Sequence, residues 1–177
     1  NNVFYATTQG ATEYTDKVGD GAGVFKSTDR GNNWTQINDG LNSLETNVLV
    51  VDPNDSEIIY LGTDDDGVYK STDGGETWKK LNVSSIPKSF GVGDIIVDPQ
   101  NSNNIYIGTV DYFRLSESRG VLGDFGIYKS TDGGTTWEEF NSGLKHLGVF
   151  SLELSEENRI LYAGTRAGGV YWISLDN

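Results

Sequence analysis

Short apolar runs recur along the chain, and glycine or polar turn residues bound each of them. Runs of this length that are rich in Ile, Val, Tyr and Leu are typical of β-strands. One kind of run closes with threonine and occurs four times, at residues 4–8, 59–63, 105–109 and 161–165. Another kind precedes three of these, at residues 48–51, 95–97 and 150–154. The first two members of the second kind are continuously apolar and stop at Asp-Pro, which predicts strands buried on both faces.

A turn motif, Ser-x-Asp-x-Gly-x-x-Trp, follows three of the threonine-closed runs. Its members are Ser27, Asp29, Gly31 and Trp34, then Ser71, Asp73, Gly75 and Trp78, and then Ser130, Asp132, Gly134 and Trp137. Serine and aspartate side chains can accept hydrogen bonds from nearby backbone N–H groups, and glycine can take a positive φ. The tryptophan adds a large apolar side chain for the core. We therefore expect structural rather than catalytic aspartates, and a buried indole after each turn.

The complete unit has four strands, which we label a to d in chain order. Strand a precedes Asp-Pro, strand b closes with threonine, strand c leads into the turn motif, and strand d follows the tryptophan. Because strand a is the most apolar and strand d the most charged, the unit fits a propeller blade with strand a at the axis. The units cover approximately residues 3–38, 47–82, 93–141 and 148–177. The first lacks strand a, the last lacks the turn motif and strand d, and no window has a helical period, so one all-β domain is predicted.

The turn motif resembles the Asp box of the sialidase-type (BNR) repeats. The longer pattern Ile-Tyr-x-Gly-Thr … Gly-Val-Tyr-Lys-Ser-Thr-Asp-Gly-Gly-x-Thr-Trp, at residues 59–78, is similar to propeller repeats in three kinds of protein. These are the xyloglucanase-like glycoside hydrolases, the sortilin-type receptors and the photosystem II assembly factors. The resemblance covers nearly the whole chain and implies a β-propeller. Because unrelated activities share these repeats, it implies no single function.

The incomplete first and last units leave partial sheets, whereas propellers usually close with about four to eight blades. Three arrangements follow: a lone four-bladed ring, a ring of about seven or eight blades made by two chains, or a fragment of a larger propeller. An unpaired strand edge favours association. We therefore expect a homo-oligomer or part of a larger propeller rather than a self-sufficient monomer.

The composition narrows the functional classes. With 26 acidic and 13 basic residues the net charge is −13, which opposes sequence-independent nucleic-acid binding. No apolar run approaches the roughly 18 residues that a membrane-spanning helix needs. The chain has no cysteine, so thiolate metal sites are excluded. It begins with neither methionine nor a signal-peptide pattern, so we expect a processed extracellular or cell-surface protein, or a piece of a longer one.

The first candidate site is a cluster of three acids in one b–c turn, which includes Asp64 and Asp66. In a propeller the b–c and d–a loops share one face, away from the Asp boxes. In the xyloglucanase-like hydrolases a catalytic aspartate follows a threonine at the end of such a strand, and the resemblance places Asp64 after Thr63 in that position. The second acid of that family comes from a separate propeller, so Asp64 alone is not an acid/base pair. The alternatives are a solvated acidic turn and a calcium site, although the EF-hand spacing is absent.

Three further candidates lie on the same predicted face. Tyr112, Phe113 and Arg114 form part of a long b–c loop, which either presents aromatic side chains to a sugar or a partner or packs onto its own blade. His146 belongs to a d–a loop and is the only histidine, so a multi-histidine metal site is excluded. Arg166 occupies the place after strand b in the last unit, as Gln9 and Asp64 do in the first two.

These patterns predict a binding or assembly module of an extracellular protein, with a carbohydrate or protein ligand on the face of the b–c and d–a loops. On its own the chain lacks a paired acid and base, so we expect it to be non-catalytic and without a cofactor. The alternative is a fragment of a xyloglucanase-like glycoside hydrolase, with Asp64 and the aromatic loop facing the glucan.

Overall fold

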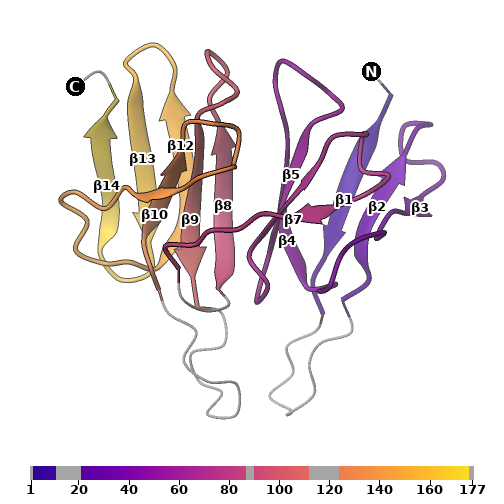
Figure 1. Cartoon of the computed structure of the whole chain (residues 1–177), viewed down its shortest axis with the longest axis horizontal. Coiled ribbons are helices and arrows are strands. Elements are labelled where there is room, and N and C mark those ends of the chain that lie inside the picture. Colours follow the sequence, from indigo (N-terminus) through magenta and orange to yellow (C-terminus); the bar gives the residue numbers. More distant parts are fainter. Residues whose placement is uncertain (1, 11–20, 87–89, 112–123, 176–177) are drawn as a thin grey trace.

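The computed structural model describes residues 2–10, 21–86, 90–111 and 124–175. Within these ranges the chain forms fourteen strands and no helix. The described part therefore holds no helix with the length and apolar character that a membrane crossing needs. All strand pairs are antiparallel, and they form four separate sheets that follow one another along the chain (Figure 1).

Each sheet is one blade of a partial β-propeller, and we number the blades 1 to 4 in chain order. Blade 1 contains β1 (Phe4–Thr8), β2 (Gly23–Ser27) and β3 (Thr35–Gln36). Blade 2 contains β4 (Thr46–Val51), β5 (Ile59–Thr63), β6 (Val68–Ser71) and β7 (Lys79–Lys80). Blade 3 contains β8 (Gly91–Val97), β9 (Ile105–Val110), β10 (Ile127–Ser130) and β11 (Glu138–Glu139). Blade 4 contains β12 (Val149–Ser155), β13 (Ile160–Thr165) and β14 (Gly169–Ser174). The predicted all-β fold of four partial or complete blades is confirmed.

Strands b and c pair in the same register in all four blades. The tyrosine of strand b lies opposite Lys26 in blade 1, Lys70 in blade 2, Lys129 in blade 3 and Trp172 in blade 4. Equivalent places in the repeated sequence therefore occupy equivalent places in the fold. This register allows any residue of one blade to be compared directly with its counterpart in the next.

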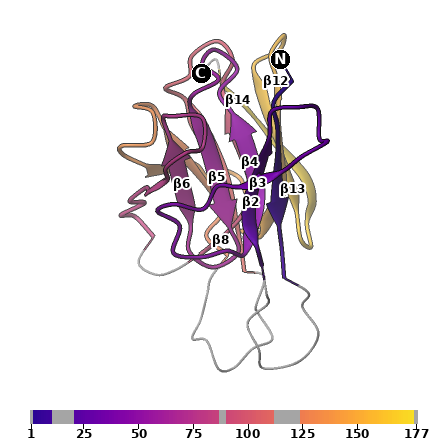
Figure 2. The ribbon, with the colours of Figure 1, turned by 90° about the vertical axis from the view of Figure 1, so that its right-hand side faces the viewer.

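Hydrophobic cores lie between successive blades, which pack face to face (Figures 1 and 2). Trp78 of blade 2 packs with Val24 of blade 1, and Trp137 of blade 3 packs with Val68 of blade 2. The whole of β5 and β9 is buried, because strand b has neighbours on both edges and on both faces. Each blade is therefore stabilised mainly by the blades beside it.

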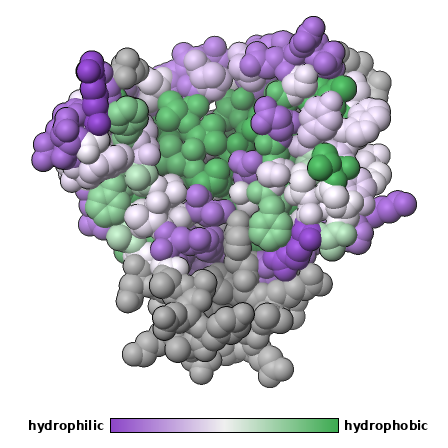
Figure 3. Space-filling model, turned by 180° about the vertical axis from the view of Figure 1, so that it is seen from behind, coloured by the Kyte–Doolittle hydropathy of each residue, from purple (hydrophilic) through white to green (hydrophobic). Residues whose placement is uncertain are grey.

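The prediction that strand a is buried on both faces is wrong for β4, whose residues 47–51 are half-buried. Strand a pairs with strand b on one edge only, and β8 lies between β4 and β12 on the side of the axis. Seen from behind, this side of the molecule carries an apolar patch near its upper middle (Figure 3). In blade 2, burial is consequently greatest in strands b and c, not at the axis.

The expectation of a buried indole after each Asp box holds for two of the three tryptophans. Trp78 is 5% exposed and Trp137 is 8% exposed, whereas Trp34 is 44% exposed. The difference arises because each of these indoles packs against the preceding blade, and no described residue forms a blade before blade 1. The core role expected of Trp34 is therefore not seen in this chain.

Candidate functional site

The Asp boxes use their acids to hold their own turns. In blade 2, Asp73 Oδ1 accepts hydrogen bonds from the Ser71 hydroxyl at 2.7 Å and the Thr77 backbone N–H at 2.9 Å. Asp73 Oδ2 accepts one from the Thr77 hydroxyl at 2.6 Å. The hydrogen bonds from Thr77, followed by that from Ser71, lower the pKa of Asp73 to about 2. Asp29 and Asp132 accept hydrogen bonds of the same kind within their own turns, and their pKa values are lowered in the same way. All three carboxylates are therefore hydrogen-bonded within their own turns.

A threonine clamp organises the opposite end of each blade, at the turn between strands b and c. The hydroxyl of the last threonine of strand b donates to the carbonyl of the glycine that opens strand c, at 3.0, 3.0, 2.9 and 3.0 Å in blades 1 to 4. The same oxygen accepts the N–H of the residue before that glycine in every blade, at 2.8, 2.9, 2.9 and 3.1 Å. The sequence contains the signal, because threonine closes all four runs, although a closing threonine by itself predicts only the end of a strand.

Asp64 follows the clamp of blade 2 and is buried, with an exposed fraction of 1%. Its Oδ2 accepts a hydrogen bond from Gln9 Nε2 of blade 1 at 2.6 Å, and its backbone N–H donates to the carbonyl of Glu45 at 2.9 Å. Its Oδ1 is buried and has no hydrogen-bond partner among the described residues. The interpretation of this acid as part of a solvated turn is therefore wrong for Asp64.

Glu45 is a second buried carboxyl beside Asp64, and the sequence patterns did not reveal it. Its Oε2 accepts the N–H of Gly10 at 2.8 Å and its Oε1 accepts that of Gly21 at 3.1 Å. Burial raises the pKa of Asp64, the hydrogen bond from Gln9 opposes that rise, and the charges of Glu45 and Asp65 add to it, so that the pKa reaches about 6. A buried acid with a strongly raised pKa is a frequent mark of a functional site.

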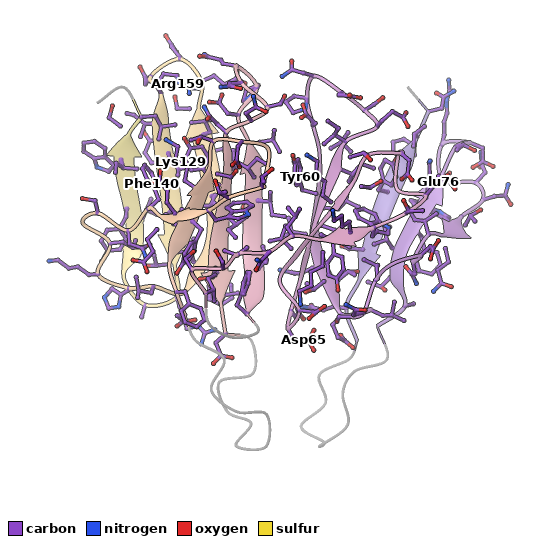
Figure 4. All side chains as sticks on the ribbon, viewed as in Figure 1. Tyr60, Asp65, Glu76, Lys129, Phe140 and Arg159 are labelled. Carbon is purple, nitrogen blue, oxygen red and sulfur yellow. The ribbon has the colours of Figure 1, made fainter. Side chains whose placement is uncertain are left out.

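The other two acids of the turn are engaged by neighbouring side chains (Figure 4 labels Asp65 at the lower edge). The Ser43 hydroxyl donates to Asp65 Oδ1 at 2.7 Å. Asp66 accepts a hydrogen bond from the Tyr69 hydroxyl and forms an ion pair with Lys80. Among the described residues no group of three or more His, Cys, Asp or Glu is placed to hold a metal ion, so the geometry gives no support to a calcium site there.

The remaining candidates lie apart from Asp64. Arg166 in blade 4 donates to the backbone carbonyl of Asp111 in blade 3, and its guanidinium carbon lies 5.2 Å from the centre of the Phe150 ring. His146 is exposed, and its ring lies against Gly168. Tyr112, Phe113 and Arg114 lie outside the described residues. The described contacts thus join Gln9, Glu45 and Asp64 into one site and place Arg166 and His146 in another part of the same face.

One carboxyl of this site can still accept a hydrogen bond. Glu45 already accepts two backbone N–H groups, whereas Asp64 keeps one oxygen without a donor. An unsatisfied buried acceptor is unfavourable by about 1–3 kcal/mol unless a donor reaches it. The site is therefore suited to accept a hydrogen bond from a ligand that displaces or joins the Gln9 side chain.

The family model for Sortilin-Vps10, described as sortilin, neurotensin receptor 3, matches residues 22–170. Among solved structures, an ancestral GH74 enzyme is 24% identical with a TM-score of 0.73, and the match covers 97% of this chain and 21% of the enzyme. A GH74 enzyme from Niastella koreensis is 26% identical with a TM-score of 0.69, covering 98% of this chain and 27% of the enzyme. The extracellular domain of a hybrid two-component system protein, BT3049 from B. thetaiotaomicron, is 17% identical with a TM-score of 0.61, covering 89% of this chain and 21% of that protein.

No curated protein matches the chain. The chain spans less than a third of each of these three structures. The likeness therefore concerns a set of consecutive blades rather than a whole enzyme or receptor.

Proposed function

The chain belongs to the Sortilin-Vps10 family of Asp-box propellers, and from that premise we propose that it is a binding or assembly module of an extracellular protein. The ligand is a carbohydrate or a protein segment, and it binds on the face of the b–c and d–a loops. The extracellular location is supported by the net charge of −13 and by the similarity of the fold to the extracellular domain of the BT3049 protein.

The observation that carries this proposal is the carboxyl of Asp64. It lies on the predicted ligand face, it bridges to blade 1 through Gln9, and its Oδ1 has no donor among the described residues. A ligand hydroxyl, amide or ammonium group that reaches this oxygen satisfies a buried acceptor. Hydrogen bonds to charged groups contribute about 1.5–3 kcal/mol, so this contact is worth roughly tenfold to a hundredfold in affinity.

The test uses xyloglucan oligosaccharides as the carbohydrate probe and calorimetry as the measurement. We expect Asp64→Asn to weaken binding by roughly tenfold or more. The matched control is Asp55→Asn, which removes one charge from an exposed turn on the other side of the blade. Equal weakening by both variants, or none by Asp64→Asn, would contradict the assignment of Asp64 to the ligand site.

The second candidate function is a fragment of a xyloglucanase-like glycoside hydrolase. The specific observation in its favour is that Asp64 is buried and its pKa is about 6, as a general acid or base requires near neutral pH. Release of reducing ends from xyloglucan separates the two functions. Binding without hydrolysis supports the module, whereas hydrolysis that Asp64→Asn abolishes supports the enzyme and overturns the first proposal.

A further inference from the structure

Two buried carboxyls lie beside each other at the b–c end of blade 2, and no cation of the described residues is paired with them. Asp64 is 1% exposed and Glu45 is 6% exposed. Their hydrogen-bond donors are neutral: the Gln9 amide binds Asp64, and the backbone N–H groups of Gly10 and Gly21 bind Glu45. None of the ion pairs between described residues includes either acid. The pair therefore carries negative charge that no described side chain neutralises.

Two other buried aspartates, both in a–b turns, do have a cation near them. Asp98 accepts hydrogen bonds from the Arg159 guanidinium on both of its oxygens. Asp52 lies close to the Lys70 ammonium: burial lowers the pKa of Lys70, and the charge of Asp52 opposes that shift. A buried charge is unfavourable unless an opposite charge compensates it. Asp64 and Glu45 thus lack the partner that the two a–b turns have.

The lysines of strand c in blades 1 and 2 cannot supply this partner, because the next blade holds their ammonium groups. In each case the lysine of strand c and the tyrosine of strand b donate to the carbonyl of a glycine in the next Asp-box turn. The donors are Lys26 and Tyr5 to Gly74, at 2.8 and 3.0 Å, and Lys70 and Tyr60 to Gly133, at 3.0 and 3.3 Å (Figure 4 labels Tyr60 between the blades). These contacts lie on the side of the Asp boxes, away from Asp64.

The Gln9 amide marks the place that a ligand nitrogen can take. Its Nε2 lies 2.6 Å from Asp64 Oδ2. Gln9 directly follows β1 and is exposed, whereas the Asp64 carboxyl that it covers is buried. A ligand can therefore displace the Gln9 side chain without moving a strand. The displacement uncovers a carboxyl whose Oδ1 has no donor among the described residues.

Both the charge and the free oxygen of this carboxyl suit a guanidinium group better than a neutral hydroxyl. A sugar hydroxyl has one proton to donate, so it serves one oxygen. A guanidinium presents parallel N–H groups in a planar fork that binds both oxygens of a carboxylate. Hydrogen bonds between ionised partners are also about twice as strong as those between neutral groups. One arginine side chain can thus neutralise Asp64 and satisfy its unpartnered oxygen.

We propose that this site binds an arginine side chain of a protein segment, whose guanidinium takes the place of the Gln9 amide and donates to both oxygens of Asp64. This inference rests on the proposed function and names the ligand group that the same site recognises. Glu45 strengthens the attraction through its charge, while its own oxygens stay bound to the N–H groups of Gly10 and Gly21.

The test is an NMR titration of the full ¹⁵N-labelled chain with a blocked peptide that carries one arginine among glycines. The side-chain NH₂ signal of Gln9 reports its displacement, and the shifts give the affinity. The matched probe is the same peptide with citrulline, which has the shape of arginine but no charge. We expect the citrulline peptide to bind about tenfold more weakly or worse.

Two substitutions should move the affinity for the arginine peptide in opposite directions. Asp64→Asn should weaken binding by about tenfold or more, because the charge is lost. Gln9→Ala should tighten binding by about threefold to tenfold, because the ligand no longer competes with the amide for Oδ2. A variant that merely disturbs the fold would not gain affinity. Asp55→Asn, which removes one charge from an exposed turn, should leave the affinity unchanged.

Xyloglucan oligosaccharides in the same titration separate this inference from the proposed function. If the sugar moves the Gln9 signal and the arginine peptide does not, the inference is overturned while the proposed function stands. Equal binding of the arginine and citrulline peptides has the same meaning. Equal weakening by Asp64→Asn and Asp55→Asn would show general attraction to an acidic chain and would also overturn the inference. If neither probe perturbs the signals of Gln9 and Asp64, both proposals are overturned.

Discussion

At the scale of single residues, Asp64 combines features that disfavour stability and favour function. Its carboxyl is buried beside Glu45, and one of its oxygens lacks a donor in the described part of the chain. Groups of this kind persist at binding and catalytic sites, where the unfavourable burial is offset by the rest of the fold. Its burial makes the stability of the free protein depend on pH.

We predict that the wild type loses stability as the pH rises from about 4 to above 6. The folded-state pKa of Asp64 is raised to about 6, so the folded state holds its proton more tightly than the unfolded state does. The contribution of Asp64 to the stability is complete below the pKa of the unfolded state, and it is lost as the pH rises through the pKa of the folded state. Two pKa units correspond to about 3 kcal/mol as an order of magnitude.

Urea unfolding at pH 4 and at pH 7.5 measures this loss. In Asp64→Asn the loss of unfolding free energy between these two pH values should be smaller by about 2–3 kcal/mol, because the titrating group is absent. Asp55→Asn, the charge-matched control on an exposed turn, should keep the wild-type difference between the two pH values. An Asp64→Asn protein with the full wild-type difference would show that another group is responsible.

At the scale of the secondary-structure element, the Asp-box turn has the same internal hydrogen bonds in three blades but different surroundings. The serine hydroxyl accepts the N–H of the box glycine at 2.8, 2.8 and 2.9 Å in blades 1, 2 and 3. The indole that follows donates to its own turn in blades 1 and 3, from Trp34 to Gly31 at 3.0 Å and from Trp137 to Gly134 at 3.1 Å, whereas Trp78 Nε1 donates to the carbonyl of Ile37 in the preceding blade at 2.8 Å. The burial of the indole also differs, because Trp34 is 44% exposed and Trp78 only 5%.

The two tryptophans therefore give a matched pair of substitutions. Trp78→Ala should lower the free energy of unfolding by about 3–5 kcal/mol, because it empties a core between two blades. Trp34→Ala should have a clearly smaller effect on the monomer, since the side chain is largely exposed. Chemical denaturation at low protein concentration compares them. Equal losses would mean that the loss of unfolding free energy comes from the turn and not from the packing of the indole on the preceding blade.

The elements themselves could be predicted from the sequence because their signals are local. Alternating and continuous apolar runs gave the strands, and Ser-x-Asp-x-Gly-x-x-Trp gave the c–d turns. The site could be predicted only in part. The place of Asp64 after Thr63 marks it as a candidate in the sequence. Gln9 and Glu45 lie 55 and 19 positions earlier, and they come close to Asp64 only because of how two blades face each other. The exposure of Trp34 depends on a neighbouring blade in the same way.

At the scale of the whole molecule, ionic and polar bridges at the a–b turns tie blades together on the side away from Asp64. Arg159 of blade 4 forms two hydrogen bonds to Asp98 of blade 3, at 3.0 and 2.6 Å (Figure 4 labels Arg159 at the upper edge). Asp98 is fully buried. Burial alone raises the pKa of Asp98, but the hydrogen bonds from Arg159 and Gln100 outweigh that effect and lower it.

Removal of Arg159 should therefore loosen blade 4 from blade 3. We expect Arg159→Met to lower the free energy of unfolding by about 3–5 kcal/mol at neutral pH, because it leaves a buried charge without its main partner. The double variant with Asp98→Asn should recover part of this loss, and chemical denaturation of all four proteins closes the cycle. Strictly additive losses would mean that the two residues act independently.

The paired donation from a tyrosine and a lysine to a carbonyl one blade further on also constrains how such a protein can change its length. A gained or lost segment that comprises one entire a-to-d module leaves every donor pair facing an acceptor turn. A segment of any other size separates a pair from its turn and leaves a half-buried carbonyl, hydroxyl and ammonium without these partners. Tandem duplication in steps of one module is thus the route of growth that the geometry permits, and divergence between modules is expected first at places outside this triad.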